Sequence, residues 1–219
     1  PTVTATPTLT PTVTATAGTP TVTATSTETP TPTPTCTPHD NGAQFTDNCD
    51  GTISDSATGL LWEKKTGTVD APVYCTPGSP CADPHGVNNL YTWSLTLGST
   101  VKNGTVYSDF LAKLNADGGF AGRTDWRLPY EDGRNAPYTG ITELQSILAA
   151  PYPCDWMSNP CIDAIFGPTA VGDNYWSATG VTQFPTFIYT ILFSYGALGT
   201  YTTEEYTSVR AVAGATPTP

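Results

Sequence analysis

The sequence predicts an α+β domain of mostly antiparallel strands and two short helices, preceded by an extended arm. Short runs of strand residues separated by turns occupy both ends of the domain, and two segments between them have apolar residues at helical spacing. The arm differs in composition, because residues 1–38 contain 18 Thr and 8 Pro and no aromatic side chain. We therefore divide the chain into an arm (1–38), a domain (39–213) and a Thr/Pro tail (214–219).

The expected elements of the domain follow in chain order. A turn at 48–51 joins the first two strands into a hairpin. Apolar spacing predicts helices at 106–116 and 141–148, the second of which starts near Thr142 and stops at Pro151. The strands are expected in the segments 43–47, 52–55, 60–62, 174–178, 184–193 and 207–212.

The charge balance excludes some partners. The chain has 8 Lys and Arg against 19 Asp and Glu, a net charge of −11, so its surface repels nucleic-acid phosphates. The longest apolar stretch, 187–193, is far short of the ~20 residues that span a bilayer. We expect neither a nucleic-acid partner nor a membrane span. Since the sequence begins at Pro1 without a signal peptide, we expect a processed form or part of a longer protein.

The arm is a degenerate repeat. The block Pro-Thr-Val-Thr-Ala-Thr occurs at 1–6, 11–16 and 20–25, and Thr fills every second position on each side of Gly18. With few apolar residues, the arm cannot offset the ordering cost of about 1–2 kcal/mol per residue and does not fold alone. One interpretation is a mucin-like stalk with covalent O-linked glycans. The candidate attachment sites are Thr2, Thr4, Thr6, Thr8, Thr10, Thr12, Thr14, Thr16, Thr19, Thr21, Thr23 and Thr25.

The other interpretation is an arm that lies on neighbouring subunits. At about 3.1 Å per residue, 38 extended residues reach on the order of 120 Å, whereas the domain is roughly 40 Å wide. Alternating Thr and Val also suit an added strand at the edge of another subunit's sheet. Head-to-tail donation of this kind does not close on itself, so it would build a filament.

The six cysteines indicate an oxidising, extracellular setting. Cys75 with Cys81, and Cys154 with Cys161, bracket short segments that look like stapled loops, which leaves Cys36 and Cys49 as a third pair. Two alternatives stay open. Cys81 and His85 could bind zinc, although no CxxC pair exists, and Cys36 could be free or bonded to another subunit.

Four motifs along the domain, in order, carry a family resemblance. They are FTDNCDGTISD with ATGLLWEK (45–55 and 57–64), GRTDWRLP (122–129), YWS (175–177) and VR (209–210). They resemble the C-terminal domain family of Legionella collagen-like proteins, a domain of unknown function that is common in bacterial surface proteins. The resemblance implies a C-type-lectin-like fold, a prokaryotic cell-surface location, and adhesion or binding of sulfated glycans.

Three features depart from that family pattern. Cys49 stands where the family usually has Gly, and residues 130–141 form an insertion. Residues 39–219 carry 8 basic and 18 acidic groups, so a sulfated ligand is disfavoured. The sugar-binding tripeptides of calcium-dependent lectins, Glu-Pro-Asn and Gln-Pro-Asp, are absent from the sequence. A lectin-like fold therefore does not by itself supply a lectin site.

Three sets of residues are candidate sites. Asp47, Asp50 and Asp55 surround a Gly turn and could hold structural calcium or form a plain hairpin turn, and we expect no other cofactor. A stapled loop could expose an apolar face to a sugar or a subunit through Tyr152, Trp156 and Met157. The single N-glycosylation sequon is at Asn103.

The remaining aromatic and charged motif residues are expected to be structural. We assign Trp62, Trp93, Trp126 and Trp176 to the core. Arg127 and Arg210 are expected to form ion pairs with Asp125 or Glu143. The sequence has no nucleophile elbow, phosphate loop or dinucleotide fingerprint, so we do not expect an enzyme.

The sequence thus favours an extracellular structural glycoprotein, a filament subunit whose arm contacts identical subunits. The alternative is a stalked adhesin whose lectin-like domain binds an extracellular glycan or a host surface. The two hypotheses differ in whether residues 1–35 contact other chains.

Overall fold

A computed structural model of the chain describes residues 39–40, 44–131, 142–149, 154 and 160–215. The chain divides into two compact units, Pro1–Thr35 and Cys36–Pro219. The expected arm (1–38) and the last four residues of the expected tail lie outside the described residues. The search for membrane-spanning helices finds no candidate among the described residues.

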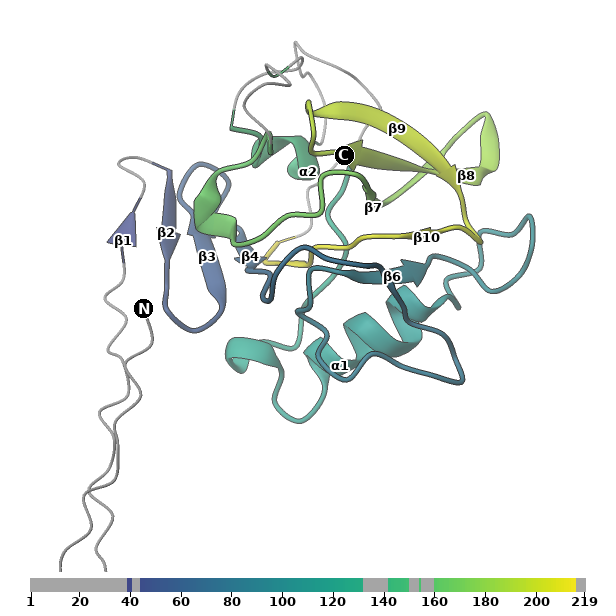
Figure 1. Cartoon of the computed structure of the whole chain (residues 1–219), viewed down its shortest axis with the longest axis horizontal. Coiled ribbons are helices and arrows are strands. Elements are labelled where there is room, and N and C mark those ends of the chain that lie inside the picture. The colour runs from purple at the N-terminus through teal and green to yellow at the C-terminus, as the bar shows by residue number, and fades with distance from the viewer. Residues whose placement is uncertain (1–38, 41–43, 132–141, 150–153, 155–159, 216–219) are drawn as a thin grey trace, which may run out of the picture. The chain divides into compact units, whose positions relative to one another are not determined.

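The first sheet has five strands in the order β1–β2–β3–β4–β11, all antiparallel to their neighbours (Figure 1). The predicted hairpin forms its centre as β2 Phe45–Asp47 and β3 Thr52–Asp55. Its turn requires left-handed backbone at Gly51, with φ of 88°. The outer strands are β1 His39–Asp40, β4 Leu61–Glu63 and β11 Val212–Ala213.

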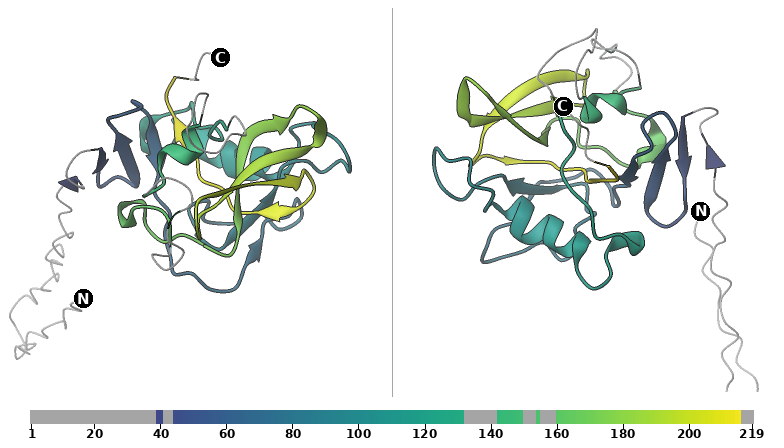
Figure 2. Two further views of the ribbon diagram at one scale, coloured as in Figure 1. Left: turned by 90° about the horizontal axis from the view of Figure 1, so that it is seen from above. Right: turned by 180° about the vertical axis from the view of Figure 1, so that it is seen from behind.

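Two further sheets have three strands each. The second, in the order β10–β6–β5, joins β10 Tyr206–Thr207, β6 Asn89–Thr92 and β5 Val73–Tyr74, and β5 runs parallel to β6. The third is an antiparallel meander. Its strands are β7 Asn174–Val181, β8 Phe184–Leu192 and β9 Ala197–Thr202. In Figure 2 the first sheet lies at one end of the domain and the turn between β7 and β8 points toward the other.

The helices are short. The predicted helix at 106–116 is present as a π-helical segment, Val106–Leu111, that continues into α1 Ala112–Asn115. The helix expected at 141–148 is limited to α2 Glu143–Ser146, because Leu148 already forms a β-bridge with Ile162. Two 3₁₀ turns complete the described helices, at Phe120–Gly122 and Ala164–Phe166.

One predicted strand is not a single element. Residues 207–212 are not one strand, since Thr207 ends β10 in the second sheet and Val212 begins β11 in the first. The segment between them crosses from one sheet to the other, and Ser208 bridges β7 at Tyr175. Val209 and Ala211 pack in the core cluster that contains Trp176, whereas Val212 packs in the cluster that contains Trp62.

The core consists of two clusters of buried side chains. One surrounds Phe110 and Trp176, and the other surrounds Trp62 and Phe166. The four Trp residues assigned to the core are all buried, as predicted: Trp62, Trp93, Trp126 and Trp176. The domain consists mainly of antiparallel sheets with a few short helices, as expected for the α+β class.

Candidate functional site

Three charged side chains and a histidine gather inside the domain, and we call Glu63, Lys65, His85 and Arg210 the charge cluster. Glu63 ends β4 and Lys65 follows two residues later, so both point to the same side of the extended chain. Lys65 Nζ and His85 Nδ1 lie 2.8 and 2.9 Å from Glu63 Oε1. The backbone N–H of Ala211 donates to Glu63 Oε2 at 3.0 Å.

Burial and ion pairing shift the pKa values of the charge cluster in opposite directions. Burial on its own raises the pKa of the Glu63 carboxyl, but Lys65 and His85 together hold it below its ordinary value. Burial lowers the pKa of Lys65 despite the opposing effect of Glu63. The cluster therefore keeps an ionised carboxylate in a place where an isolated charge would be very costly.

Arg210 completes the charge cluster without a direct ion pair. Its side chain is fully buried and donates to the carbonyl oxygens of Glu63 and Phe166 at 2.9 and 3.0 Å. The guanidinium also lies over the Phe166 ring, 5.5 Å from its centre. The expected pairing of Arg210 with Asp125 or Glu143 is wrong, because the crossing segment carries this side chain into the core.

The charge cluster pairs a carboxylate with a histidine, as a catalytic triad does. Among the described residues, His85 makes no hydrogen bond to a Ser, Thr or Cys side chain, and its ring packs on Phe120 at 4.3 Å. Glu63 and Lys65 are withdrawn from solvent. The charge cluster joins the first sheet to the 83–85 loop and to the crossing segment.

Sequence reasoning missed the charge cluster, although a signal was present. Glu63 and Lys65 have the two-residue spacing of one strand face, beside a Trp assigned to the core. The zinc alternative had drawn attention to His85 with Cys81. In the structure these two residues have different partners: Cys81 forms a disulfide with Cys75, and His85 contacts Glu63.

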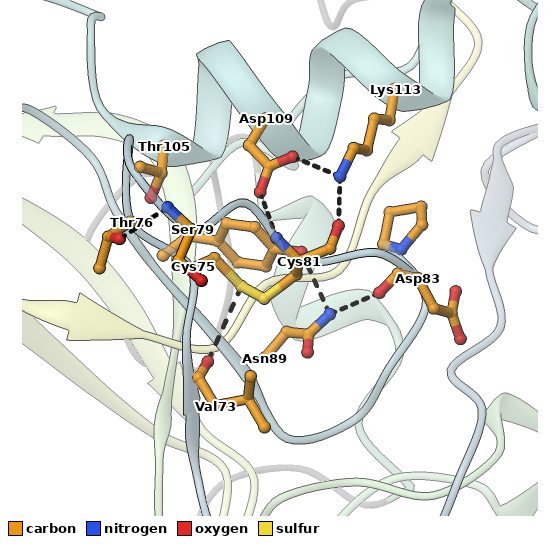
Figure 3. Close-up of a disulfide and its surroundings, with 12 residues drawn as sticks. Val73, Cys75, Thr76, Ser79, Cys81, Asp83, Asn89, Thr105, Asp109 and Lys113 are labelled. Carbon is orange, nitrogen blue, oxygen red and sulfur yellow. Dashed lines mark hydrogen bonds and ion pairs between the residues drawn. A yellow bond between two sulfur atoms is a disulfide. The ribbon is translucent and has the colours of Figure 1, made fainter.

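The Cys75–Cys81 disulfide staples a loop onto the helical segment (Figure 3). The backbone N–H of Cys81 donates to Asp109 Oδ2 at 3.0 Å, and Asp109 Oδ1 pairs with Lys113 Nζ at 2.7 Å. Lys113 also donates to the Cys81 carbonyl oxygen. Both loop and helix are thereby fixed around one carboxylate.

The other cysteines that the structure describes are also bonded. Cys154 is bonded to Cys161, and Cys49 is disulfide-bonded. The expected partner of Cys49, Cys36, lies outside the described residues. The residues proposed to contact a ligand or a subunit, Tyr152, Trp156 and Met157, lie outside them as well.

The three candidate calcium ligands form hydrogen bonds and an ion pair with other groups of the domain. The Asp47 carboxylate pairs with Lys64 Nζ at 2.5 Å and accepts the N–H of Cys49 at 2.9 Å. Asp50 accepts from the N–H and hydroxyl of Thr52, and Asp55 accepts from the Thr58 hydroxyl and the Ala57 N–H. Within the described chain no group of three acidic, His or Cys side chains could hold a metal. These carboxylates form turns instead.

A second charge pair joins two other segments. Arg127 binds Glu143 through two parallel hydrogen bonds of 2.6 and 2.8 Å, which ties the 122–129 motif to α2. This is one of the two partners predicted for Arg127. The other candidate, Asp125, pairs with Arg123 on the surface at 2.5 Å.

Most basic side chains of the domain are committed to acidic partners. Ion pairs engage five of them with carboxylates: Lys64, Lys65, Lys113, Arg123 and Arg127. Of the basic residues that the structure describes, Lys102 and Arg210 have no carboxylate partner, and Lys102 lies 5.9 Å from the Trp93 and Tyr107 ring centres. The described surface offers no group of free cations for a sulfated glycan.

The sequon at Asn103 is built into the fold. Asn103 Oδ1 accepts from the backbone N–H of Leu95 at 2.8 Å, and its Nδ2 donates to Thr96 Oγ1 at 3.2 Å. Thr105 is fully buried and its hydroxyl accepts from the N–H of Thr92. Glycosylation at Asn103 stays a prediction, and it would require Nδ2 to leave its bond to Thr96.

One edge of the third sheet is open. Strand β9 pairs with β8, and within the described part of the chain no other backbone group bonds to residues 198–201. The opposite edge of this sheet is different, because residues outside the sheet bond to β7. Ser208 both donates to and accepts from β7 backbone groups, and the Pro129 carbonyl oxygen accepts from the N–H of Ala178. We call the outer side of residues 197–202 the β9 edge.

The family comparison agrees with this domain. Residues 51–213 match the model of the Lcl C-terminal domain, which is well over half of the chain. The chain belongs to the Lcl C-terminal domain family. Its Lcl domain runs from the β2–β3 turn to the end of β11 and contains the charge cluster and the β9 edge. No curated protein and no solved structure matches the chain.

Proposed function

We propose that this Lcl protein is a non-enzymatic structural glycoprotein of a prokaryotic cell surface. In this proposal it is the subunit of a self-assembling filament, and its Thr/Pro arm, with O-linked glycans, contacts neighbouring subunits. The proposal gives the domain a C-type-lectin-like fold that serves assembly. Three features support the proposal: the composition of the arm, the way the arm enters the domain, and the commitment of the polar groups.

The entry of the arm carries the proposal. Strand β1 pairs with β2 so that His39 lies opposite Asp47 and Asp40 opposite Thr46. The chain therefore reaches the domain as the edge strand of a five-stranded sheet. A flexible stalk does not need to join the domain as a paired strand. An arm that bonds to a neighbour needs such an attachment, because it must pass tension to the folded domain.

Most of these polar side chains already bind partners within the domain, which favours assembly over ligand binding. The charge cluster lies in the core, the basic side chains are largely paired, and the acidic side chains of the first hairpin form its turns. A net charge of −11 also opposes binding of polyanions. The disulfides favour an extracellular setting, where such bonds persist.

The test is limited proteolysis of the folded full chain. The arm is removed before Cys36, and the products are compared by electron microscopy and sedimentation with a sample treated with inactivated protease. We expect the intact chain to form filaments and the trimmed chain to remain monomeric. Filaments of the trimmed chain, or an intact chain that stays monomeric at all concentrations, would contradict the proposal.

A further inference from the structure

We propose that residues 21–29 of one copy add as an antiparallel strand to the β9 edge of a neighbouring copy. The inference rests on the proposed function and specifies its contact. It follows from the open backbone of β9, the distribution of proline in the arm, and the position of charges at the end of β9.

The β9 edge lacks the devices that normally keep sheet edges from pairing. Ala197–Thr202 contains no charged residue and no proline, and it is six residues long. Thr200 and Tyr201 are exposed, Tyr201 to 38%. In an edge strand about half of the backbone N–H and C=O groups point away from the sheet, so β9 offers a row of groups for another strand.

The other described edges are closed or too short. Val212 of β11 exchanges both backbone bonds with Arg127 at 2.9 Å. Strands β1 and β5 have two residues each, and β1 leads directly to the arm. Among the strands that the structure describes, β9 is therefore the edge on which an added strand could form a full ladder.

The arm contains one segment that suits this edge best. Proline cannot donate to a ladder, so only proline-free stretches can pair along their whole length. Residues 21–29 are nine residues between Pro20 and Pro30 that contain neither proline nor glycine. The next stretch, 12–19, is interrupted by Gly18, and 2–6 is shorter than β9.

Charge selects the antiparallel orientation. Residues 21–29 carry one charge, Glu28, near their C-terminal end, and β9 is followed by Glu204 and Glu205. A parallel strand would bring Glu28 toward those two carboxylates, whereas an antiparallel strand places it near the beginning of β9. Like charges held close together destabilise a strand pair.

The alternation of the segment reconciles pairing with glycosylation. Thr at the odd positions 21–29 shares one face of the strand, and Val22, Ala24, Ser26 and Glu28 share the other. Side chains stand perpendicular to the direction in which strands pair, so glycans on the Thr face would leave the backbone groups free. The backbone ladder and the face with small side chains then remain available for contact.

The test is photo-crosslinking in the full chain. Tyr201 is replaced by benzoylphenylalanine, and the control carries the same replacement at Tyr74, which is 55% exposed on β5. Chains labelled with ¹⁴N and ¹⁵N are mixed before irradiation, so that crosslinks between copies are distinguished by mass. We expect mixed-label crosslinks from position 201 to residues 21–29, and at least tenfold fewer from position 74.

Two arm variants sharpen the test. Thr25→Pro places proline in the centre of the donor segment, and Thr33→Pro lies in the linker between Pro32 and Pro34. We expect the first to reduce the crosslink at least tenfold and the second to leave it within twofold. Same-label crosslinks alone, or assembly with crosslinks elsewhere, would overturn the β9 contact but leave the proposed function. Absence of any assembly would overturn both.

Discussion

Lys65 Nζ lies 2.8 Å from Glu63 Oε1, and both side chains are almost completely withdrawn from solvent. Removing two such charges from water costs several kcal/mol for each ion, and the mutual attraction offsets this cost only while both charges are present. The pair also lies beside the Phe110 ring, whose centre is 4.6 Å from Lys65 Nζ. The domain should therefore be far more sensitive to loss of one partner than to loss of a surface pair.

Replacing Lys65 tests this relationship. Lys65→Met keeps the length of the side chain but leaves the Glu63 carboxylate with one fewer partner, so we expect a loss of about 3 kcal/mol in the free energy of unfolding. The matched control is Lys64→Met, whose ion pair with Asp47 is partly exposed and should contribute less than about 1 kcal/mol. Denaturant unfolding measures both. Equal effects in the two variants would contradict a buried role for Lys65.

Acid should weaken the domain through Glu63. The pKa of this carboxyl in the folded protein is held below its ordinary value, so the unfolded chain takes up the proton more readily. The stabilisation is complete above the unfolded pKa of about 4.3 and is lost as pH falls through the folded pKa. Burial lowers the pKa of Lys65, so this group costs stability as pH falls from its unfolded pKa of about 10.4 toward its folded pKa.

The measurement is the melting temperature as a function of pH, from 7 downward. We expect the acid slope to be shallower in Glu63→Gln than in the unmodified protein, because the amide that replaces the carboxyl does not titrate. Glu205→Gln, at an exposed position, is the control and should keep the original slope. Parallel curves for all three proteins would rule out Glu63 as a source of acid sensitivity.

The fold could be predicted where a local pattern is strong. The β2–β3 hairpin follows from an Asn-Cys-Asp-Gly turn between strand residues, and β3 has the predicted bounds. Strand β9 was missed because Ala-Leu-Gly-Thr-Tyr-Thr has little apolar alternation, and an edge strand has little to bury. The crossing segment between β10 and β11 was missed because its buried residues face two sheets.

The site could be predicted less well, because its contacts are distant in sequence. Arg210 bonds to the carbonyl oxygen of Glu63 across 147 positions, and no local spacing carries that information. The Arg127–Glu143 pair was predicted as one of two options, since the sequence places both residues in neighbouring motifs. The three hairpin carboxylates looked like a calcium loop because Asx turns and calcium loops use the same residue types.

The Arg127–Glu143 pair should require the planar guanidinium. Arg127→Lys keeps the charge but cannot form the two parallel bonds of 2.6 and 2.8 Å, so we expect a loss of about 1–2 kcal/mol in the free energy of unfolding. Arg123→Lys is the control, because its pair with Asp125 is exposed and should change stability little. An Arg127→Lys variant as stable as the unmodified chain would show that only the charge matters there.

Gly104 allows no side chain, for a reason that lies in the backbone around it. A Cβ at this position would be 2.2 Å from the Thr92 carbonyl oxygen and 2.3 Å from the Trp93 carbonyl carbon. Both are main-chain atoms of the buried strand region, and Gly104 N donates to the Trp93 carbonyl oxygen at 3.1 Å. We expect Gly104→Ala to cost about 2–3 kcal/mol in the free energy of unfolding, since the strand cannot move aside without breaking its pairing.

Gly78→Ala is the matched control, because nothing lies within 4 Å of a Cβ there, and it should stay within about 0.5 kcal/mol of the unmodified chain. Urea unfolding measures both variants, and a Gly104→Ala protein as stable as the control would mean that β6 and the sequon loop separate more easily than their close contact implies.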